Sequence, residues 1–154
     1  WDLESPLLED TELGDALRKR TALISPGAAQ MDLAVSGAHV SLPSGTKHHL
    51  LRIGQEAITN AVRHAAATRI SIRLDYQADM VRLTVADDGV GFQPDDVLVK
   101  SIGHFGLRGL RSRATKIGGT LRIDSSPGNG TSIEIVVPLV NHQNLPSHAL
   151  SSAV

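Results

Sequence analysis

The chain has 154 residues, of which 41% are hydrophobic and 20% charged, with a formal net charge of −1. This length and apolar content suffice for one hydrophobic core, so we expect one compact domain. The near-neutral charge excludes a global attraction to nucleic acid or to an anionic membrane, so we expect neither partner. No apolar run approaches the roughly 20 residues that span a bilayer, and the absence of cysteine excludes disulfides and thiolate metal sites.

The N-terminal part of the chain carries two modest patterns. Apolar residues fall at helical spacing between Leu13 and Ile24, and they predict a helix that ends at the Ser-Pro-Gly of residues 25–27. Residues 31–40 alternate weakly between apolar and polar side chains, which predicts a strand followed by a loop over 42–45.

A stronger helix follows over residues 47–66. Its apolar residues recur every three or four positions and form a wide stripe that is typical of a helix packed on a core. The polar stripe on its other side consists of Arg52, Glu56, Asn60 and Arg63.

Two hairpins and a second helix complete the pattern. Alternation over residues 70–76 and 81–85 predicts one antiparallel hairpin, and residues 121–123 and 133–137 predict another. Helical spacing returns between them, over 107–117. Together the elements predict an α+β fold, a two-layer sandwich in which helices cover one face of a mixed, mostly antiparallel sheet.

Glycines gather at three places along the second half of the chain: residues 89–91, 103–109 and 128–130. Glycine permits a close approach of the backbone to a ligand and costs stability elsewhere, so three clusters around one sheet favour a backbone-lined pocket. For each cluster taken alone, an ordinary turn is the favoured explanation.

Four segments carry a resemblance to a known family. Residues 55–64 (QEAITNAVRH) resemble the N box, 87–91 (DDGVG) the D-x-G-x-G box, 103–110 (GHFGLRGL) the following glycine box, and 128–131 (GNGT) the last one. In this order they resemble the ATP-binding catalytic domain of bacterial sensor histidine kinases, within the gyrase, Hsp90, histidine kinase and MutL superfamily. The resemblance implies the Bergerat ATP-binding fold. The segment 110–114 looks most like kinases that are paired with NarL-type response regulators.

The resemblance implies that the chain binds ATP with Asp87 at the adenine. A carboxylate at a strand end accepts a hydrogen bond from the exocyclic amine of adenine, whereas guanine presents an oxygen there and would leave it unpaired. Gly89 and Gly91 would make room for the base. An ordinary turn after a strand also explains these residues.

Glu56 and Asn60 lie four residues apart and therefore share a face of the long helix. Oxygen ligands suit Mg²⁺, and the resemblance places Asn60 on the metal, with Glu56 as a ligand through water or as a catalytic base. Arg63 and His64 would lie at the nucleotide, Arg63 near phosphate oxygens. A solvated face with Glu–Arg ion pairs is the alternative.

The second helix is expected to bind phosphate at its start. Gly106, Leu107, Arg108 and Gly109 open it, where free backbone N–H groups and the positive end of the helix dipole attract anions. The aperiodic segment before it, 92–105, would close over the nucleotide. Thr131 would bind a phosphate or hydrogen-bond within its own hairpin.

The seven histidines do not include a phosphoacceptor, because none is followed directly by an acidic residue. We therefore expect the phosphoacceptor and dimerisation helices to lie upstream of Trp1. Residues 1–30 would lead from them, 31–140 would form the ATP-binding domain and 141–154 a tail. The partners expected are this upstream domain and a response regulator. The fragment would be a monomer and the whole kinase a homodimer, with this domain as the cytoplasmic part of a membrane-bound sensor.

Two alternatives to phosphoryl transfer remain at this point. The chain could be an ATP hydrolase of the MutL or Hsp90 kind, with Glu56 activating water. It could also be a nucleotide-responsive module, similar to an anti-sigma factor, that acts through partner contact.

Overall fold

The computed structural model describes residues 12–24, 29–63, 66–93 and 105–139. No helix within these ranges combines the length and apolarity needed to cross a membrane. The elements in chain order are α2 (Leu13–Ile24), β1 (Gln30–Ser36), α3 (Ser44–Arg63), β2 (Arg69–Tyr76), β3 (Met80–Asp87), α5 (Phe105–Lys116), β4 (Thr120–Ser125) and β5 (Thr131–Pro138).

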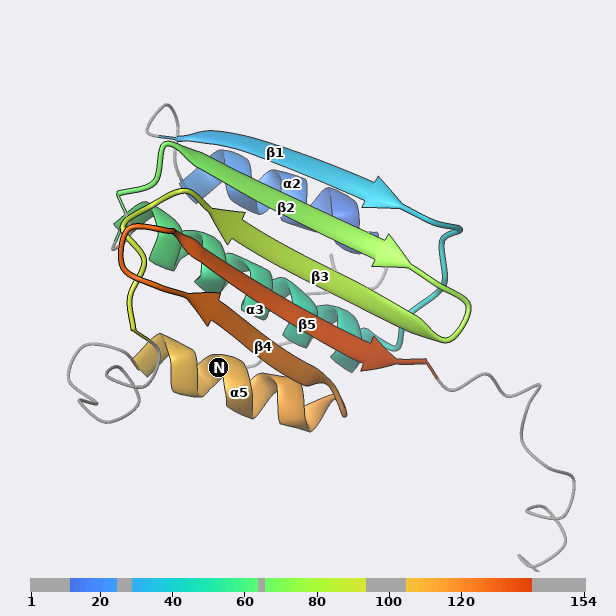
Figure 1. The fold of residues 1–154 in the computed structure, drawn as a ribbon. Coiled ribbons are helices and arrows are strands. Elements are labelled where there is room, and N and C mark those ends of the chain that lie inside the picture. Colours follow the sequence, from blue (N-terminus) through green and yellow to red (C-terminus); the bar gives the residue numbers. More distant parts are fainter. Residues whose placement is uncertain (1–11, 25–28, 64–65, 94–104, 140–154) are drawn as a thin grey trace, which may run out of the picture.

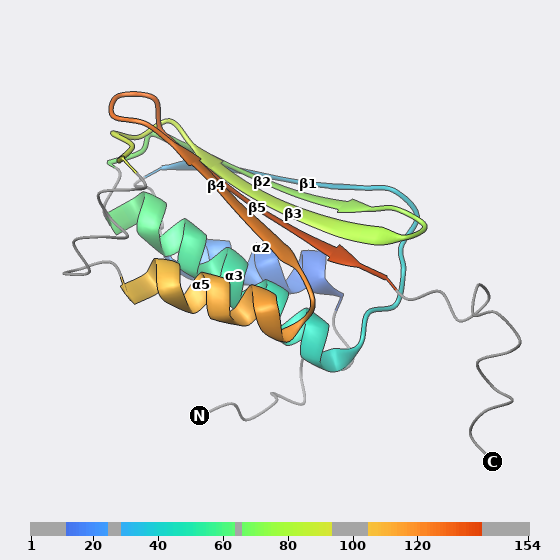
Figure 2. The same ribbon diagram turned by 60° about the horizontal axis from the view of Figure 1, so that its bottom comes forward.

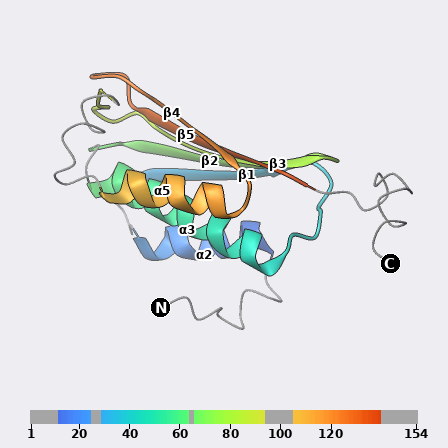
Figure 3. The same cartoon turned by 90° about the horizontal axis from the view of Figure 1, so that it is seen from below.

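The strands form one sheet in the order β1-β2-β3-β5-β4 (Figure 1). Strand β1 pairs with β2 in parallel, and the other three pairings are antiparallel. Helices α2, α3 and α5 all lie against the same face of the sheet, which the rotated views show from two further angles (Figures 2 and 3). The expected α+β sandwich is therefore confirmed.

The core lies between the helices and the sheet, where the buried face of the helices packs against the buried face of the strands. Alternate residues of the central strands face the helices and are buried, as the period of two in a strand requires. The apolar stripe of α3 covers them. Buried residues of α3 are Leu50, Leu51, Ile53, Gly54, Ala57, Ile58 and Ala61.

Helix α2 belongs to the same core as the sheet. Its first two turns bury Leu13 and Leu17, which are 1% and 0% exposed. Both side chains join the cluster that α3 and the central strands form. The prediction that a helix precedes the first strand is thus confirmed, and its packing makes α2 an integral part of the layer.

The boundaries of α3 differ from the sequence prediction. The helix begins at Ser44 rather than Lys47, because the carbonyl oxygen of Pro43 accepts a hydrogen bond from the Lys47 N–H at 3.0 Å and so starts the helical ladder. It ends at Arg63 rather than residue 66, and Ala66 has a positive φ of 49°, which a helix does not allow. The loop expected at 42–45 is accordingly shorter.

Candidate functional site

Four ends of secondary structure meet at one end of the molecule. The C-terminus of α3, the C-terminus of β3, the N-terminus of β5 and the N-terminus of α5 all lie at the left of Figure 1. Since β3 and β5 are antiparallel neighbours, the end of one strand adjoins the start of the other, and Asp87 pairs with Thr131. The fold therefore brings segments from the four sequence boxes together.

Asp87 ends the buried row of β3. It continues the alternation of Val81, Leu83 and Val85, so its side chain is directed to the face of the sheet that the helices cover. The carboxylate accepts a hydrogen bond from the Gly89 N–H at 2.8 Å.

Ionisation of the Asp87 carboxyl is disfavoured in this position. Burial raises the pKa of its carboxyl above the usual value, although hydrogen bonds from the backbone of Gly89 and Thr131 act in the opposite direction. The result is a half-buried acceptor at the end of an apolar core.

Asp88, its neighbour, has a different role that the sequence did not indicate. Its carboxylate accepts hydrogen bonds from the N–H groups of Thr68 and Arg69 at 2.8 and 2.9 Å and from the Thr68 hydroxyl at 2.6 Å. These bonds lower the pKa of the Asp88 carboxyl. The Asp88 carboxylate therefore connects the end of β3, by hydrogen bonds, to Thr68 and Arg69 at the start of β2.

Two glycines allow the β4–β5 turn to pack against the segment after β3. Gly91 has φ +64°, and a Cβ atom there would lie 2.1 Å from the carbonyl oxygen of Ser126. Gly130 has φ +71°, and its Cβ would lie 2.1 Å from the carbonyl oxygen of Asp87. Both positions require glycine for conformation and for space, independently of any ligand.

Ser125 is a second residue that sequence reasoning missed. Its hydroxyl accepts a hydrogen bond from the Phe92 N–H at 2.9 Å and donates one to the Gly130 carbonyl at 3.0 Å. It also lies 2.8 Å from the Thr131 hydroxyl. Of the two roles expected for Thr131, the buried hydroxyl thus serves the hairpin, while its backbone N–H is directed to Asp87.

Glu56 lies in a cavity between α3 and α5. The cavity has a volume of about 330 Å³, and Glu56 and Thr59 from α3 face Gly109 and Leu110 from α5 across it. Asn60 lies one turn further along α3 and, like Glu56, is half-buried. The structure thus places Glu56 opposite Gly109 and Leu110 of α5, with Asn60 one turn further along α3.

The oxygen atoms of this region fit a magnesium ion held together with phosphate. The described residues contain no group of three or more His, Asp or Glu side chains that would bind a metal ion by itself. Glu56, Asn60 and Gln55 offer oxygens, and within the described ranges the Gln55 Oε1 atom is buried without a hydrogen-bond partner. Magnesium suits such a site because it retains water and phosphate ligands beside one or two protein oxygens.

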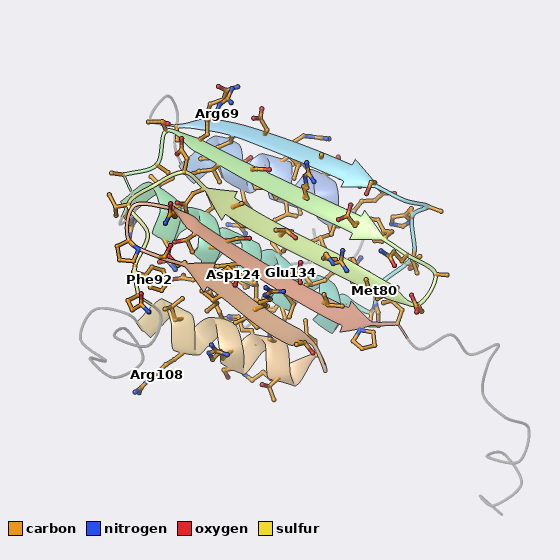
Figure 4. The ribbon with its side chains drawn as sticks, in the orientation of Figure 1. Arg69, Met80, Phe92, Arg108, Asp124 and Glu134 are labelled. Carbon is orange, nitrogen blue, oxygen red and sulfur yellow. The ribbon has the colours of Figure 1, made fainter. Side chains whose placement is uncertain are left out.

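The described residues at the start of α5 differ in exposure. Leu107 is buried in the core, at 6% exposure. Arg108 is exposed and points away from the sheet, as Figure 4 shows. Gly109 is exposed, with open space where a Cβ would be. The structure therefore does not bring Arg108 to the other predicted residues.

The remaining predicted residues are either exposed or outside the described part of the chain. Arg63 is the last residue of α3 and is exposed. His64 and residues 94–104, which include most of the segment expected to close over the nucleotide, lie outside the described residues.

Comparison with known proteins gives consistent matches. The family described as histidine kinase-, DNA gyrase B- and HSP90-like ATPases matches residues 45–141. The sensor protein VraS of Staphylococcus epidermidis is 35% identical over 137 residues, which cover 89% of this chain and 38% of that protein. VraS of Staphylococcus aureus is 36% identical over 132 residues, covering 86% of this chain and 37% of VraS. The chain thus spans less than two fifths of the length of these relatives.

Solved structures agree in fold. The histidine kinase domain of the blue-light activated kinase EL346 of Erythrobacter litoralis superposes with a TM-score of 0.68 at 26% identity, covering 82% of this chain and 59% of that one. The ATP binding domain of PrrB from Mycobacterium tuberculosis gives a TM-score of 0.64 at 26% identity, covering 85% of this chain and 96% of that domain.

Proposed function

We propose, from the premise that this chain belongs to the histidine kinase-, DNA gyrase B- and HSP90-like ATPase family, that its residues hold Mg·ATP for phosphoryl transfer to a histidine outside the chain. The chain is an ATP-binding domain of the sensor histidine kinase type. What is proposed beyond this is the role of each residue, the metal and the partners.

The observation that carries the proposal is the position of Asp87. Its carboxylate ends a buried apolar row and faces the helices, so an adenine ring beside it would be in apolar contact while its amino group donates to the carboxylate. Guanine would leave the carboxylate unpaired, at a cost of roughly 1–3 kcal/mol.

The phosphates would extend from Asp87 toward the start of α5. The backbone N–H groups at the start of α5 would donate hydrogen bonds to phosphate oxygens. Glu56 faces the same region from α3, and Asn60 lies one turn further along that helix. Asn60 would hold Mg²⁺, with Glu56 bound through water or acting as a base. The metal would neutralise charge on the phosphates. This chain contributes positioning, because phosphoryl transfer needs the acceptor and the phosphorus in line.

The partners follow from the same function. A histidine on a dimerisation domain would receive the phosphoryl group, and a response regulator would receive it next. The resemblance of residues 110–114 supports a regulator of the NarL type. The domain would act in the cytoplasm as part of a homodimeric sensor. Hydrolysis and partner contact without transfer are not favoured, because the relatives are sensor kinases.

Calorimetric titration with Mg²⁺ and a non-hydrolysable ATP analogue tests this proposal. We expect saturable binding by this chain, at least tenfold weaker binding of the GTP analogue, and loss of the ATP analogue's advantage in Asp87→Asn. The control is Asp79→Asn, because Asp79 follows β2 at the opposite end of the sheet (Figure 1) and is exposed. A folded chain that binds neither nucleotide would contradict the proposal.

A further inference from the structure

The cavity between α3 and α5 extends beyond the predicted site to an arginine of α3. Arg52 lines it together with Glu56. Arg52, Glu56 and Asn60 are spaced by four residues, so they form one row along the helix, with about 6 Å of rise between successive members. The row runs from Asn60, near the end of the molecule that holds Asp87, toward Arg52 in the interior of α3.

A second arginine reaches the same cavity from α5. Arg113 lies one turn after Gly109, is half-buried, and donates a hydrogen bond to the Nδ1 atom of His49 at 3.4 Å. This contact holds the guanidinium group against α3. The cavity is therefore bounded by one arginine from each helix, and neither position belongs to a sequence box for nucleotide binding.

The charge of the cavity favours an anion. Among the described residues that line it, Glu56 is the only acidic one, against Arg52 and Arg113. Neither guanidinium forms an ion pair with a carboxylate of the described residues. Both arginines border the cavity, Arg52 as an exposed residue and Arg113 as a half-buried one. A phosphate in the cavity would suit them, because each planar guanidinium group offers paired N–H donors to phosphate oxygens.

We propose that Arg52 and Arg113 bind the terminal phosphate of the nucleotide and so make this domain distinguish a triphosphate from a diphosphate. The inference rests on the proposed function, because it takes the base to lie at Asp87 and the metal at Asn60. With those two positions fixed, the third phosphate is the part of the nucleotide that lies furthest along the row, beyond Glu56. The alternative is that both arginines only solvate their helices.

Parallel titrations with ADP and with a non-hydrolysable ATP analogue, both with Mg²⁺, test the inference on this chain. The variants are Arg52→Gln, Arg113→Gln and the double substitution, with Arg52→Lys and Arg113→Lys as conservative forms. Lys116→Gln is the matched control, because Lys116 is an exposed cation one turn further along α5 that does not line the cavity. A thermal melt of each variant establishes that it is folded.

The expected result is a change in the ratio of the two affinities. Each Gln substitution should weaken binding of the ATP analogue about tenfold, the lysine forms less so, while the affinity for ADP stays within about twofold. Equal weakening for both nucleotides, or no weakening, would overturn the inference and leave the proposed function standing. A wild-type chain that binds neither nucleotide would instead overturn the proposed function, and the inference with it.

Discussion

Two adjacent aspartates show how strongly position decides the chemistry of a residue. Asp87 is half-buried at the end of an apolar row, and burial raises the pKa of its carboxyl. Asp88 is exposed, and three hydrogen bonds to its carboxylate lower its pKa. One carboxylate thus weakens the fold when it is charged and is available to a ligand, whereas the other stabilises the fold when it is charged.

Asp87→Asn should leave the fold at least as stable as the wild type at pH 7. A carboxyl whose pKa is raised on folding stabilises the protein fully below about pH 4, and that contribution is lost as the pH rises through the folded pKa. The amide keeps an oxygen that can accept the Gly89 N–H. Melting temperatures of both proteins at pH 4 and pH 7 check this, and a markedly lower value for the variant at pH 7 would contradict it.

Asp88→Ala should lower the melting temperature at pH 7, because the Thr68 and Arg69 N–H groups lose their acceptor. The lowered pKa means that this stabilisation is present above about pH 4 and is lost as the pH falls through the folded pKa. The difference between wild type and variant should therefore shrink at pH 3. Asp88→Asn, which keeps one acceptor oxygen, is the intermediate control, and a difference that persists at pH 3 would argue against this role.

At the scale of elements, helix α5 contains a glycine, Gly109, that the packing of the helix does not require. Gly109 lies in the helix interior, and a Cβ there would meet no atom of the described residues within 4 Å. Glycine in a helix costs about 0.5–1 kcal/mol relative to alanine. A residue that weakens its helix without a packing reason is consistent with the close approach of a phosphate.

Gly109→Ala should therefore stabilise the chain by about 0.5–1 kcal/mol and weaken binding of the ATP analogue. Urea denaturation followed by circular dichroism measures the first effect, and calorimetric titration measures the second. Ser112→Ala, an exposed change on the same helix, is the control that should leave binding unchanged. If Gly109→Ala binds the nucleotide as tightly as the wild type, the glycine has no role in phosphate binding.

At the scale of the whole molecule, one core joins elements that lie far apart in the chain. Helix α2 packs against α3, and both bury residues in the cluster that the central strands form. A domain with one such core is expected to unfold cooperatively. The N-terminal helix should then unfold with the sheet and not before it.

Leu17→Ala should lower the free energy of unfolding by about 2–5 kcal/mol, because it removes a fully buried side chain and leaves a cavity. The matched control is Leu23→Ala on the same helix, where the side chain is 77% exposed and the expected change is within about 0.5 kcal/mol. Urea denaturation should show one transition in both. A separate early transition in Leu17→Ala would mean that α2 unfolds independently of the sheet.

The sequence alone predicted the elements and their layers, and its resemblance to a known family supplied the residues of the candidate site, which stay a prediction. Periodicity fixed the helices and hairpins because a buried face repeats at the period of its element. The four-residue spacing of Glu56 and Asn60, and the position of Asp87 after an alternating strand, follow from the same local rule. The start of α3 at Ser44 was missed because its first residues, Ser44, Gly45 and Thr46, add no large apolar side chain to the periodic stripe.

Only the tertiary structure decided the contacts between distant residues. The bond from Thr68 to Asp88 spans 20 positions, that from Phe92 to Ser125 spans 33, and the contact from His49 to Arg113 spans 64. No periodicity connects such pairs, because they become neighbours only when strands pair and helices pack on the sheet. Folding therefore decided that Asp87 is half-buried and that Asp88 is bonded to Thr68 and Arg69, and it brought Arg52 and Arg113 to one cavity.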